Sequence, residues 1–338
     1  MEKIRLGRTG LMVSRSGFGA IPIQRITADQ STALLRKAYD AGINFFDTAH
    51  GYSDSEEKIG RALSSVRKNI ILATKTPATN RKDFFEHLEL SLKRLCTDYI
   101  DIYQLHNPKA LPRPGDETGL YDALLEAKKS GKIRFGGITN HRLPVAREAV
   151  ESSLYDTLQF PFSSLSSEAD MALVAAAKEK DIGFIAMKGL AGGLLTNARS
   201  TFTFIRGTNH AVPIWGIEKP EQLAEFIALE NDPPELDDAM REIIEHDRVE
   251  LAGAFCRGCG YCLPCPEGIE INVASRITLL MRRMPVAPFV GSQWRAKMEL
   301  IENCKECGQC AARCPYELDP PSMLKKQLVE YRKFVSGL

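Results

Sequence analysis

The spacing of the cysteines constrains this chain more than any other feature of its sequence. Eight of the nine cysteines lie between Cys256 and Cys314, and only Cys96 precedes them. They form two matching segments, each with three cysteines at intervals of three residues and a fourth that precedes a proline. The second segment reads C-x2-C-x2-C-x3-C-P from Cys304, and the first, from Cys256, is one residue shorter before its fourth cysteine.

This spacing is typical of segments that hold two cubane iron–sulfur clusters. Three cysteines of one segment ligate one cluster, and the fourth, followed by proline, reaches the other cluster. Structural zinc sites instead use two well-separated cysteine pairs, which does not account for the third cysteine. The sequence therefore predicts two [4Fe–4S] clusters with the following ligands: Cys256, Cys259, Cys262 and Cys314 for the first, and Cys304, Cys307, Cys310 and Cys265 for the second.

The two segments together resemble bacterial two-cluster ferredoxins, with a longer insert between them. The insert has Ile277, Leu280, Met281 and Met284 at helical spacing, which predicts a helix there. Cys96 stands apart, and we interpret it as a small buried hydrophobic residue.

The chain before residue 230 alternates short apolar runs with amphipathic helical patterns. Runs that are apolar on both faces are typical of buried parallel strands. Eight such units in about 230 residues predict a (β/α)8 barrel, for which about 250 residues are usual; an open doubly wound sheet is the alternative. The predicted strands are Ser16–Ala20, Ile43–Ala49, Asn69–Thr76, Ile100–His106, Phe135–Asn140, Thr157–Phe162, Gly183–Gly189 and Ala211–Ile217.

The predicted organisation is an α/β TIM barrel followed by a small, α-rich, ferredoxin-like domain. The opening stretch Ile4–Ser14 is expected to be a hairpin that plugs the bottom of the barrel. We place the barrel in residues 1–230, a helical linker in 231–252, the two-cluster domain in 253–320 and a C-terminal helix in 321–338. Helices are expected at 235–251, in the linker, and at 322–335, in the C-terminal part.

Composition and charge exclude several classes of partner. The formal net charge is +1, which gives no electrostatic basis for binding nucleic acid or a membrane surface. The first residues do not form a signal peptide, and no run of 18 apolar residues is present. Many cysteines without an export signal favour metal or redox chemistry over disulfides, so we expect a cytoplasmic protein.

Four polar residues fall at or just beyond the C-terminal ends of predicted strands, where barrel active sites lie. Each of Asp47, Tyr52, Lys75 and His106 has an ordinary structural explanation when taken alone. Together they form a proton-delivery set. The ammonium of Lys75, kept charged by Asp47, is expected to lower the pKa of the Tyr52 phenol from its usual value near 10. The phenol then protonates a carbonyl oxygen to which His106 donates a hydrogen bond.

The order and the flanking residues of these four positions resemble the aldo-keto reductase family. The segment Phe45–Ala49, with Tyr52 after it, is similar to the family's motif behind its second strand. The segment Leu95–His106 is similar to the motif of its fourth strand, with Cys96 in place of the usual glycine. The resemblance implies NAD(P)H-dependent reduction of a small carbonyl compound, with these four residues as the catalytic set.

The same resemblance implies where a nicotinamide cofactor is held. Thr139, Asn140 and Gln159 stand where the family binds the nicotinamide amide, and Met187 where it stacks an aromatic ring. Gly189 opens a loop similar to the family's pyrophosphate loop. Gly216, Lys219 and Gln222 match the adenosine-phosphate region, and Lys219 favours NADP over NAD because it can pair with a 2′-phosphate.

The two halves of the chain leave three interpretations open. A hydride carries two electrons and a cluster one, so exchange between them calls for a flavin. In the first interpretation, a carbonyl reductase exchanges electrons with a redox partner protein through its clusters. In the second, the clusters are structural. In the third, the chain is a nucleotide-binding redox sensor or electron-transfer protein similar to potassium-channel β subunits, and the intact set of four residues counts against it.

Overall fold

The structure is a computed structural model that describes residues 1–251 and 255–337. The chain divides into two compact units. The first comprises Met1–Gly189 and Arg199–Asp237, and the second comprises Leu190–Ala198 and the chain from Asp238 onward. The boundary expected between residues 252 and 253 and the final residue 338 lie outside the described residues.

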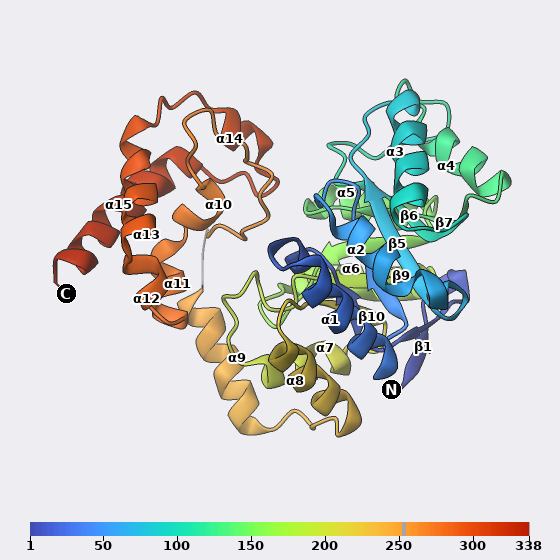
Figure 1. Ribbon diagram of the computed structural model, residues 1–338, viewed down its shortest axis with the longest axis horizontal. Helices are drawn as coiled ribbons and strands as arrows, with labels where there is room; N and C mark the ends of the chain where they lie inside the picture. The colour runs from blue at the N-terminus through green and yellow to red at the C-terminus, as the bar shows by residue number, and fades with distance from the viewer. Residues whose placement is uncertain (252–254, 338) are drawn as a thin grey trace. The chain divides into compact units, whose positions relative to one another are not determined.

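The first unit is a closed barrel of eight parallel strands with helices around it (Figure 1). Strand β10 pairs with β3 and closes the circle. Closure excludes the open doubly wound sheet and confirms the predicted fold. The strands are short, and nearly all of their residues are buried, which explains why they appear in the sequence as apolar runs. They are β3 Gly17–Gly19, β4 Phe45–Asp47, β5 Ile71–Thr76, β6 Ile100–His106, β7 Ile133–Thr139, β8 Thr157–Pro161, β9 Gly183–Met187 and β10 Ala211–Gly216.

Helices follow the strands and surround the barrel. In α1 the buried residues Leu34, Leu35 and Ala38 recur at helical spacing, as the sequence predicts. Thr27 caps α1 in a reciprocal capping box with Gln30, which satisfies free amides of the first turn. The helices are α1 Ala28–Asp40, α2 Ser55–Leu63, α3 Arg81–Arg94, α4 Leu120–Lys129, α5 Leu143–Ser152, α6 Glu168–Glu179, α7 Ala198–Gly207 and α8 Pro220–Asn231.

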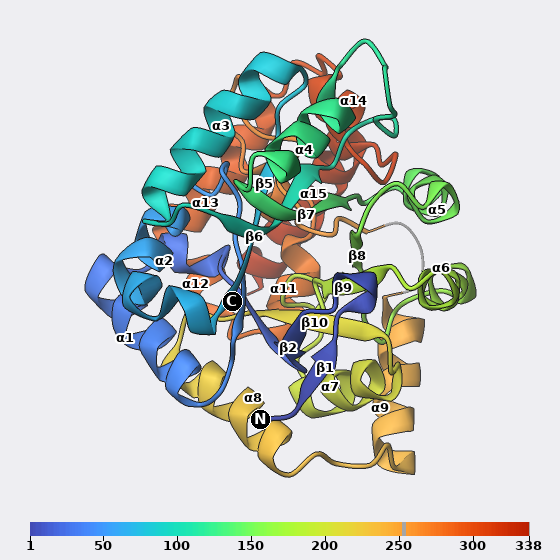
Figure 2. The same cartoon turned by 90° about the vertical axis from the view of Figure 1, so that its right-hand side faces the viewer.

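A hairpin closes the end of the barrel at which the strands begin. Strands β1 Lys3–Arg5 and β2 Met12–Ser14 pair antiparallel and lie beside β9 and β10 (Figure 2). Leu6, Leu11 and Val13 belong to the same buried cluster as side chains from inside the barrel. Gly7 approaches so closely that a Cβ there would lie 2.3 Å from the Gly183 nitrogen. The predicted plug is confirmed, so any site must use the opposite end.

The described residues of the second unit form helices joined by loops and contain no β-strand. Its core gathers Ile269, Ile277, Met298, Leu324 and Tyr331. The helices expected at 235–251 and 322–335 are present, and Met284 lies just beyond α11 in an extended conformation. The α-helices in the described part of this unit are α9 Asp238–Glu250, α10 Ile271–Ala274, α11 Ile277–Arg283, α12 Ala287–Val290, α13 Ser292–Glu299, α14 Gln309–Arg313 and α15 Pro320–Ser336.

Cys96 corrects one sequence prediction. It is exposed rather than buried, and its φ is +52°. It directly follows Leu95, the C-cap of α3, where a left-handed residue ends many helices and glycine is usual. The backbone conformation of the turn, rather than packing, therefore determines where this side chain lies.

Gly60, inside α2, provides a test of the barrel's helix packing. A Cβ there would lie 2.2 Å from the Arg94 carbonyl oxygen, and its other near neighbours are also backbone atoms. Gly→Ala inside a helix usually stabilises by up to about 1 kcal/mol. Here we expect Gly60→Ala to destabilise by about 1–3 kcal/mol through overpacking, measured by urea unfolding.

Gly207→Ala is the matched control, since nothing lies within 4 Å of a Cβ at that helix end. Equal stability changes in the two variants would contradict the close contact between α2 and the end of α3.

Candidate functional site

Three barrel strands and one turn bring the four predicted catalytic residues to the end opposite the plug. Asp47 and His106 end β4 and β6, and Lys75 is the penultimate residue of β5. Tyr52 lies in the turn before α2, where its amide donates to the Ala49 carbonyl. All four therefore lie at or just beyond the C-terminal strand ends.

A buried ion pair forms the base of this site. Lys75 Nζ lies 2.6 Å from Asp47 Oδ2 and also donates to the Thr48 carbonyl. The Lys75 side chain is 1% exposed and that of Asp47 3% exposed. A charged lysine this deep is stable only with such a partner.

The phenol and the imidazole lie against this pair. Lys75 Nζ is 5.2 Å from the centroid of the Tyr52 ring. The Tyr52 and His106 rings meet edge to face, with centroids 5.9 Å apart. The structure therefore brings all four residues predicted from the sequence into one contiguous group.

The pKa of Tyr52 corrects the expectation from the sequence. Burial raises the pKa of the phenol above its usual value, and the negative charge of Asp47 raises it further. Burial also raises the pKa of Asp47 and lowers that of Lys75, while each partner of the pair opposes the shift of the other. Tyr52 consequently keeps its proton at neutral pH instead of being made more acidic by the ammonium.

His106 is neutral in this site. Burial first, and the nearby Lys75 charge second, lower the pKa of His106 to about 3. A neutral imidazole has one N–H that donates and one nitrogen that accepts. The site therefore contains a neutral hydrogen-bonding group beside a protonated phenol.

The predicted nicotinamide-binding positions lie on the next strands in register. Thr139 ends β7 and lies opposite both His106 on β6 and Gln159 on β8. Thr139 Oγ1 is buried without a hydrogen-bond partner, which suits a ligand amide. Gln159 Oε1 accepts from Gln104 Nε2 at 2.8 Å.

Gln104 is a site residue that the sequence prediction missed. Its amide contacts Gln159 and lies 3.4 Å from Asp47 Oδ1, so it links the ion pair to the cofactor positions. Its place two residues before His106 on one strand was an available signal, because alternate residues share a face.

Asn140 and Met187 are also placed at strand ends, with different surroundings. Asn140 Nδ2 donates to the Pro108 carbonyl and its Oδ1 accepts from the Arg142 amide. The Asn140 side chain is therefore occupied in joining two loops. Met187 ends β9 and is 8% exposed.

The glycines and the polar residues near β10 have mainly structural contacts. A Cβ at Gly189 would lie 2.6 Å from the Trp215 ring, and one at Gly216 3.2 Å from Pro22. Gln222 Oε1 accepts from the amides of Glu218 and Lys219, each at 3.0 Å, and so caps α8. The Lys219 side chain is exposed and available to solvent-borne ligands.

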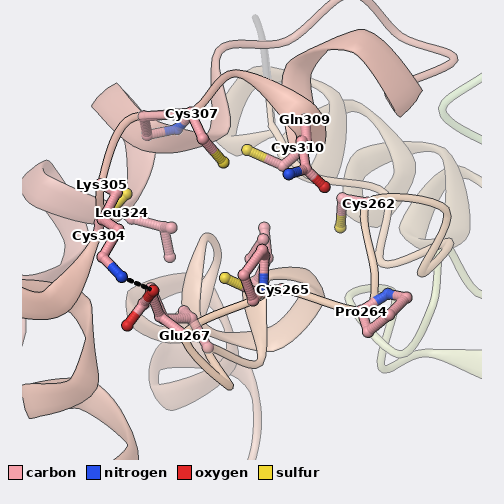
Figure 3. A pocket seen from close by; sticks show the side chains of 14 residues that line it. Cys262, Pro264, Cys265, Glu267, Cys304, Lys305, Cys307, Gln309, Cys310 and Leu324 are labelled. Carbon is pink, nitrogen blue, oxygen red and sulfur yellow. Dashed lines mark ion pairs between the residues drawn. The ribbon is translucent and has the colours of Figure 1, made fainter.

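The cysteines surround two hollows in the second unit. Cys256, Cys259, Cys262 and Cys314 line one hollow. Cys265, Cys304, Cys307 and Cys310 line the other, a cavity of about 220 Å³ whose wall also includes Cys262 (Figure 3). The two groupings match the two predicted ligand sets, including the exchange of the fourth cysteines between segments.

The sulfurs of the described cysteines are not gathered at the spacing that a single zinc ion requires. A tetrahedral zinc ion with Zn–S bonds of about 2.3 Å brings its sulfurs to roughly 3.8 Å of one another. Among residues 1–251 and 255–337, no three cysteine sulfurs lie within 4.8 Å of each other. The close group that does occur there is His246, Asp247 and Glu250, whose carboxylates pair with Arg283.

A closed parallel barrel with a polar site at its C-terminal strand ends defines a (β/α)8 barrel of the enzyme type. The Aldo/keto reductase family model matches residues 15–206, which is more than half of the chain, and the chain belongs to this family. The 4Fe-4S dicluster domain model matches residues 255–319, the second unit's cysteine region.

Curated relatives share the barrel. The chain is 34% identical over 215 residues to the aldo-keto reductase YhdN of Bacillus subtilis, covering 58% of this chain and 64% of that protein. It is also 34% identical over 219 residues to an L-galactose dehydrogenase of Arabidopsis thaliana, covering 58% of this chain and 67% of that one.

Solved structures show the same fold. An aldo-keto reductase from Bacillus halodurans matches with a TM-score of 0.64 at 24% identity, covering 73% of this chain and 96% of that chain. An aldo-keto reductase from Klebsiella pneumoniae in complex with NADPH matches with a TM-score of 0.63 at 21% identity, covering 72% and 94%. Within the described residues, no helix has the length and apolar character needed to cross a membrane.

The depressed pKa of His106 predicts a pH-dependent loss of stability. An unfolded histidine titrates near 6.5, so the unfolded chain takes up a proton that native His106 does not. This contribution is complete above about pH 6.5 and is lost as the pH falls toward the folded value of about 3. Between about pH 7.5 and pH 5.5, the wild type should lose about 1.4 kcal/mol more stability than His106→Gln, measured by urea unfolding.

The exposed His246, on α9, provides the control. His246→Gln removes a histidine that belongs to the second unit, and an unchanged pH dependence in His106→Gln would show that His106 is not held neutral.

Proposed function

We propose that the barrel reduces a small aldehyde or ketone with NAD(P)H, with Tyr52 as the general acid. The observation that carries this proposal is the contiguity of the buried Lys75–Asp47 pair, the phenol and the neutral imidazole. The balanced reaction adds one hydride to the carbonyl carbon and one proton to its oxygen, giving an alcohol and the oxidised nucleotide.

Tyr52 holds the proton for this reaction. Because burial raises its pKa, the phenol stays protonated until an acceptor stronger than water develops beside it. A carbonyl oxygen becomes such an acceptor as negative charge builds on it. The Lys75 ammonium, 5.2 Å from the ring centroid, then stabilises the phenolate that forms.

The remaining groups orient Lys75 and the substrate and stabilise the charge that develops on the substrate oxygen. Asp47 and the Thr48 carbonyl hold Lys75 Nζ in place. His106 is neutral, so its N–H donates to the substrate oxygen without competing as a proton donor. Gln104 keeps Gln159 and Asp47 in position across the barrel mouth.

A nicotinamide bound at these strand ends would supply the hydride. The unpartnered Thr139 Oγ1 and the Gln159 amide would hold its carboxamide, and Met187 would pack against its ring. Asn140 would support the cofactor site through its contacts with Pro108 and Arg142, which join two loops. NADP is favoured over NAD by the exposed Lys219 and by the NADPH complex of the Klebsiella relative.

We also propose that the second unit holds two [4Fe–4S] clusters through the two cysteine sets. Their presence in the same chain as a hydride-transfer barrel favours exchange with a one-electron redox partner, and a flavin is the cofactor able to split a hydride's electron pair. Thiolate ligands of this kind, without disulfides, suit the reducing cytoplasm.

Tyr52→Phe tests the proposed acid. We expect kcat to fall by about 10²–10⁴-fold, because the phenol oxygen and its proton are lost. Nucleotide affinity, measured by fluorescence titration, and iron content should stay unchanged.

Tyr39→Phe is the matched control, since the Tyr39 hydroxyl accepts a hydrogen bond from Asn69 on the outside of the barrel. Undiminished carbonyl turnover in Tyr52→Phe would refute the assignment. Nucleotide binding without turnover of any aldehyde in the wild type would favour the redox-sensor interpretation.

Metal analysis tests the second unit. Anaerobically purified protein should contain about eight iron and about eight acid-labile sulfide per chain, as two cubanes require. Cys307→Ser should lose about half of each, whereas Cys96→Ser should keep both. Stoichiometric zinc without sulfide would remove the two-cluster proposal.

A further inference from the structure

Arg276 is a buried cation in the second unit. It is 7% exposed and lies at the N-cap of α11. Its Nε donates to the Asn272 carbonyl at 3.1 Å, but Nη1 is buried and has no hydrogen-bond partner. No carboxylate within the described parts of the chain lies at ion-pair distance from it, in contrast to Arg283, which pairs with Asp247 and Glu250.

The first cysteine segment folds directly against this guanidinium. A Cβ at Gly258 would lie 2.4 Å from Nη2 and 2.5 Å from Cζ of Arg276. A Cβ at Gly192 would lie 3.0 Å from Nη1. Both glycines have positive φ, so glycine is favoured there both by conformation and by space. The charge is therefore held in a fixed position beside the backbone that joins Cys256 to Cys259.

The negative charges that face Arg276 are those of the cysteines. Burial lowers the pKa of Arg276, and the thiolates of Cys256 and Cys259 raise it. The Asn272 carbonyl that accepts from Arg276 Nε also lies 3.7 Å from Cys256 Sγ. A buried cation without a counter-charge costs several kcal/mol, so a metal-bound thiolate set is the partner that compensates it.

The second hollow has no equivalent cation among its described lining residues. Lys305 there is 74% exposed and pairs with Glu267 at 2.6 Å (Figure 3). Arg313 is exposed and donates to the Pro264 carbonyl and to Gln309. Exposed and paired charges are screened by water, so they act weakly on a neighbouring cluster.

We propose, on the basis of the two-cluster function above, that Arg276 is a positioning residue that raises the reduction potential of the cluster held by Cys256, Cys259, Cys262 and Cys314. Each cluster takes up one electron from an external one-electron donor, and no bond forms or breaks. The added negative charge is stabilised by a fixed, buried cation, since charge and solvent exposure set cluster potentials. The two clusters consequently differ, and the first is reduced before the second.

The test is an anaerobic titration of the intact protein with dithionite, followed by electron paramagnetic resonance. Arg276→Gln should lower the equilibrium constant for reducing the first cluster by tenfold or more, a shift of about 59 mV to more negative potential. Arg276→Lys keeps the positive charge and should shift the potential of the first cluster less. Arg313→Gln is the control and should shift neither cluster. Cys259→Ala and Cys307→Ala, each removing one cluster, assign the two midpoints.

Each outcome decides the proposal. Loss of the first cluster in Arg276→Gln but not in Arg276→Lys would also support the proposal, because it would show that the cluster needs a positive charge at this position. Three outcomes would overturn the proposal: an unchanged reduction potential in Arg276→Gln, equal shifts in the Gln and Lys variants, or loss of the first cluster in both variants. Wild-type protein without iron and sulfide would instead contradict the two-cluster function itself, before Arg276 is tested.

Discussion

The pairing of Lys75 with Asp47 is the interaction on which the barrel site depends. Two charges at the centre of a closed sheet are stable only together, and their geometry is fixed by neighbouring strands in register. The pair gives the site a net charge near zero while placing an ammonium beside Tyr52. The protonated phenol and the neutral His106 both follow from burial around that pair.

Much of the fold could be predicted because parallel barrel strands are buried on both faces. The centres of all eight strands fall within the apolar runs expected from the sequence, and β7 begins two residues earlier than expected, at Ile133. The ends of the strands were less predictable, because a strand stops pairing where its neighbouring strand stops. Cys96 was wrongly placed because a turn conformation, which depends on the neighbouring chain path, controls it.

The candidate site was predictable in its members but not in its electrostatics. The strand-end rule placed Asp47, Lys75 and His106 together, but it gives no depth of burial. Depth raises the pKa of Tyr52 instead of lowering it, because burial disfavours the phenolate and the Asp47 charge disfavours it further. Gln104 was missed for a related reason, since the sequence shows only that it shares a strand face with His106, while its contacts depend on residues of neighbouring strands.

The exchange of fourth cysteines between the two hollows has a mechanical consequence. Cys314 reaches the hollow of the first segment and Cys265 that of the second, so metal bound at either place would tie together stretches of chain about 40 to 50 residues apart. Such a tie restricts the unfolded chain in the same way as a covalent crosslink. With both proposed clusters bound, the helical unit would be crosslinked twice, and the supply of iron would then determine how long the unit survives proteolysis.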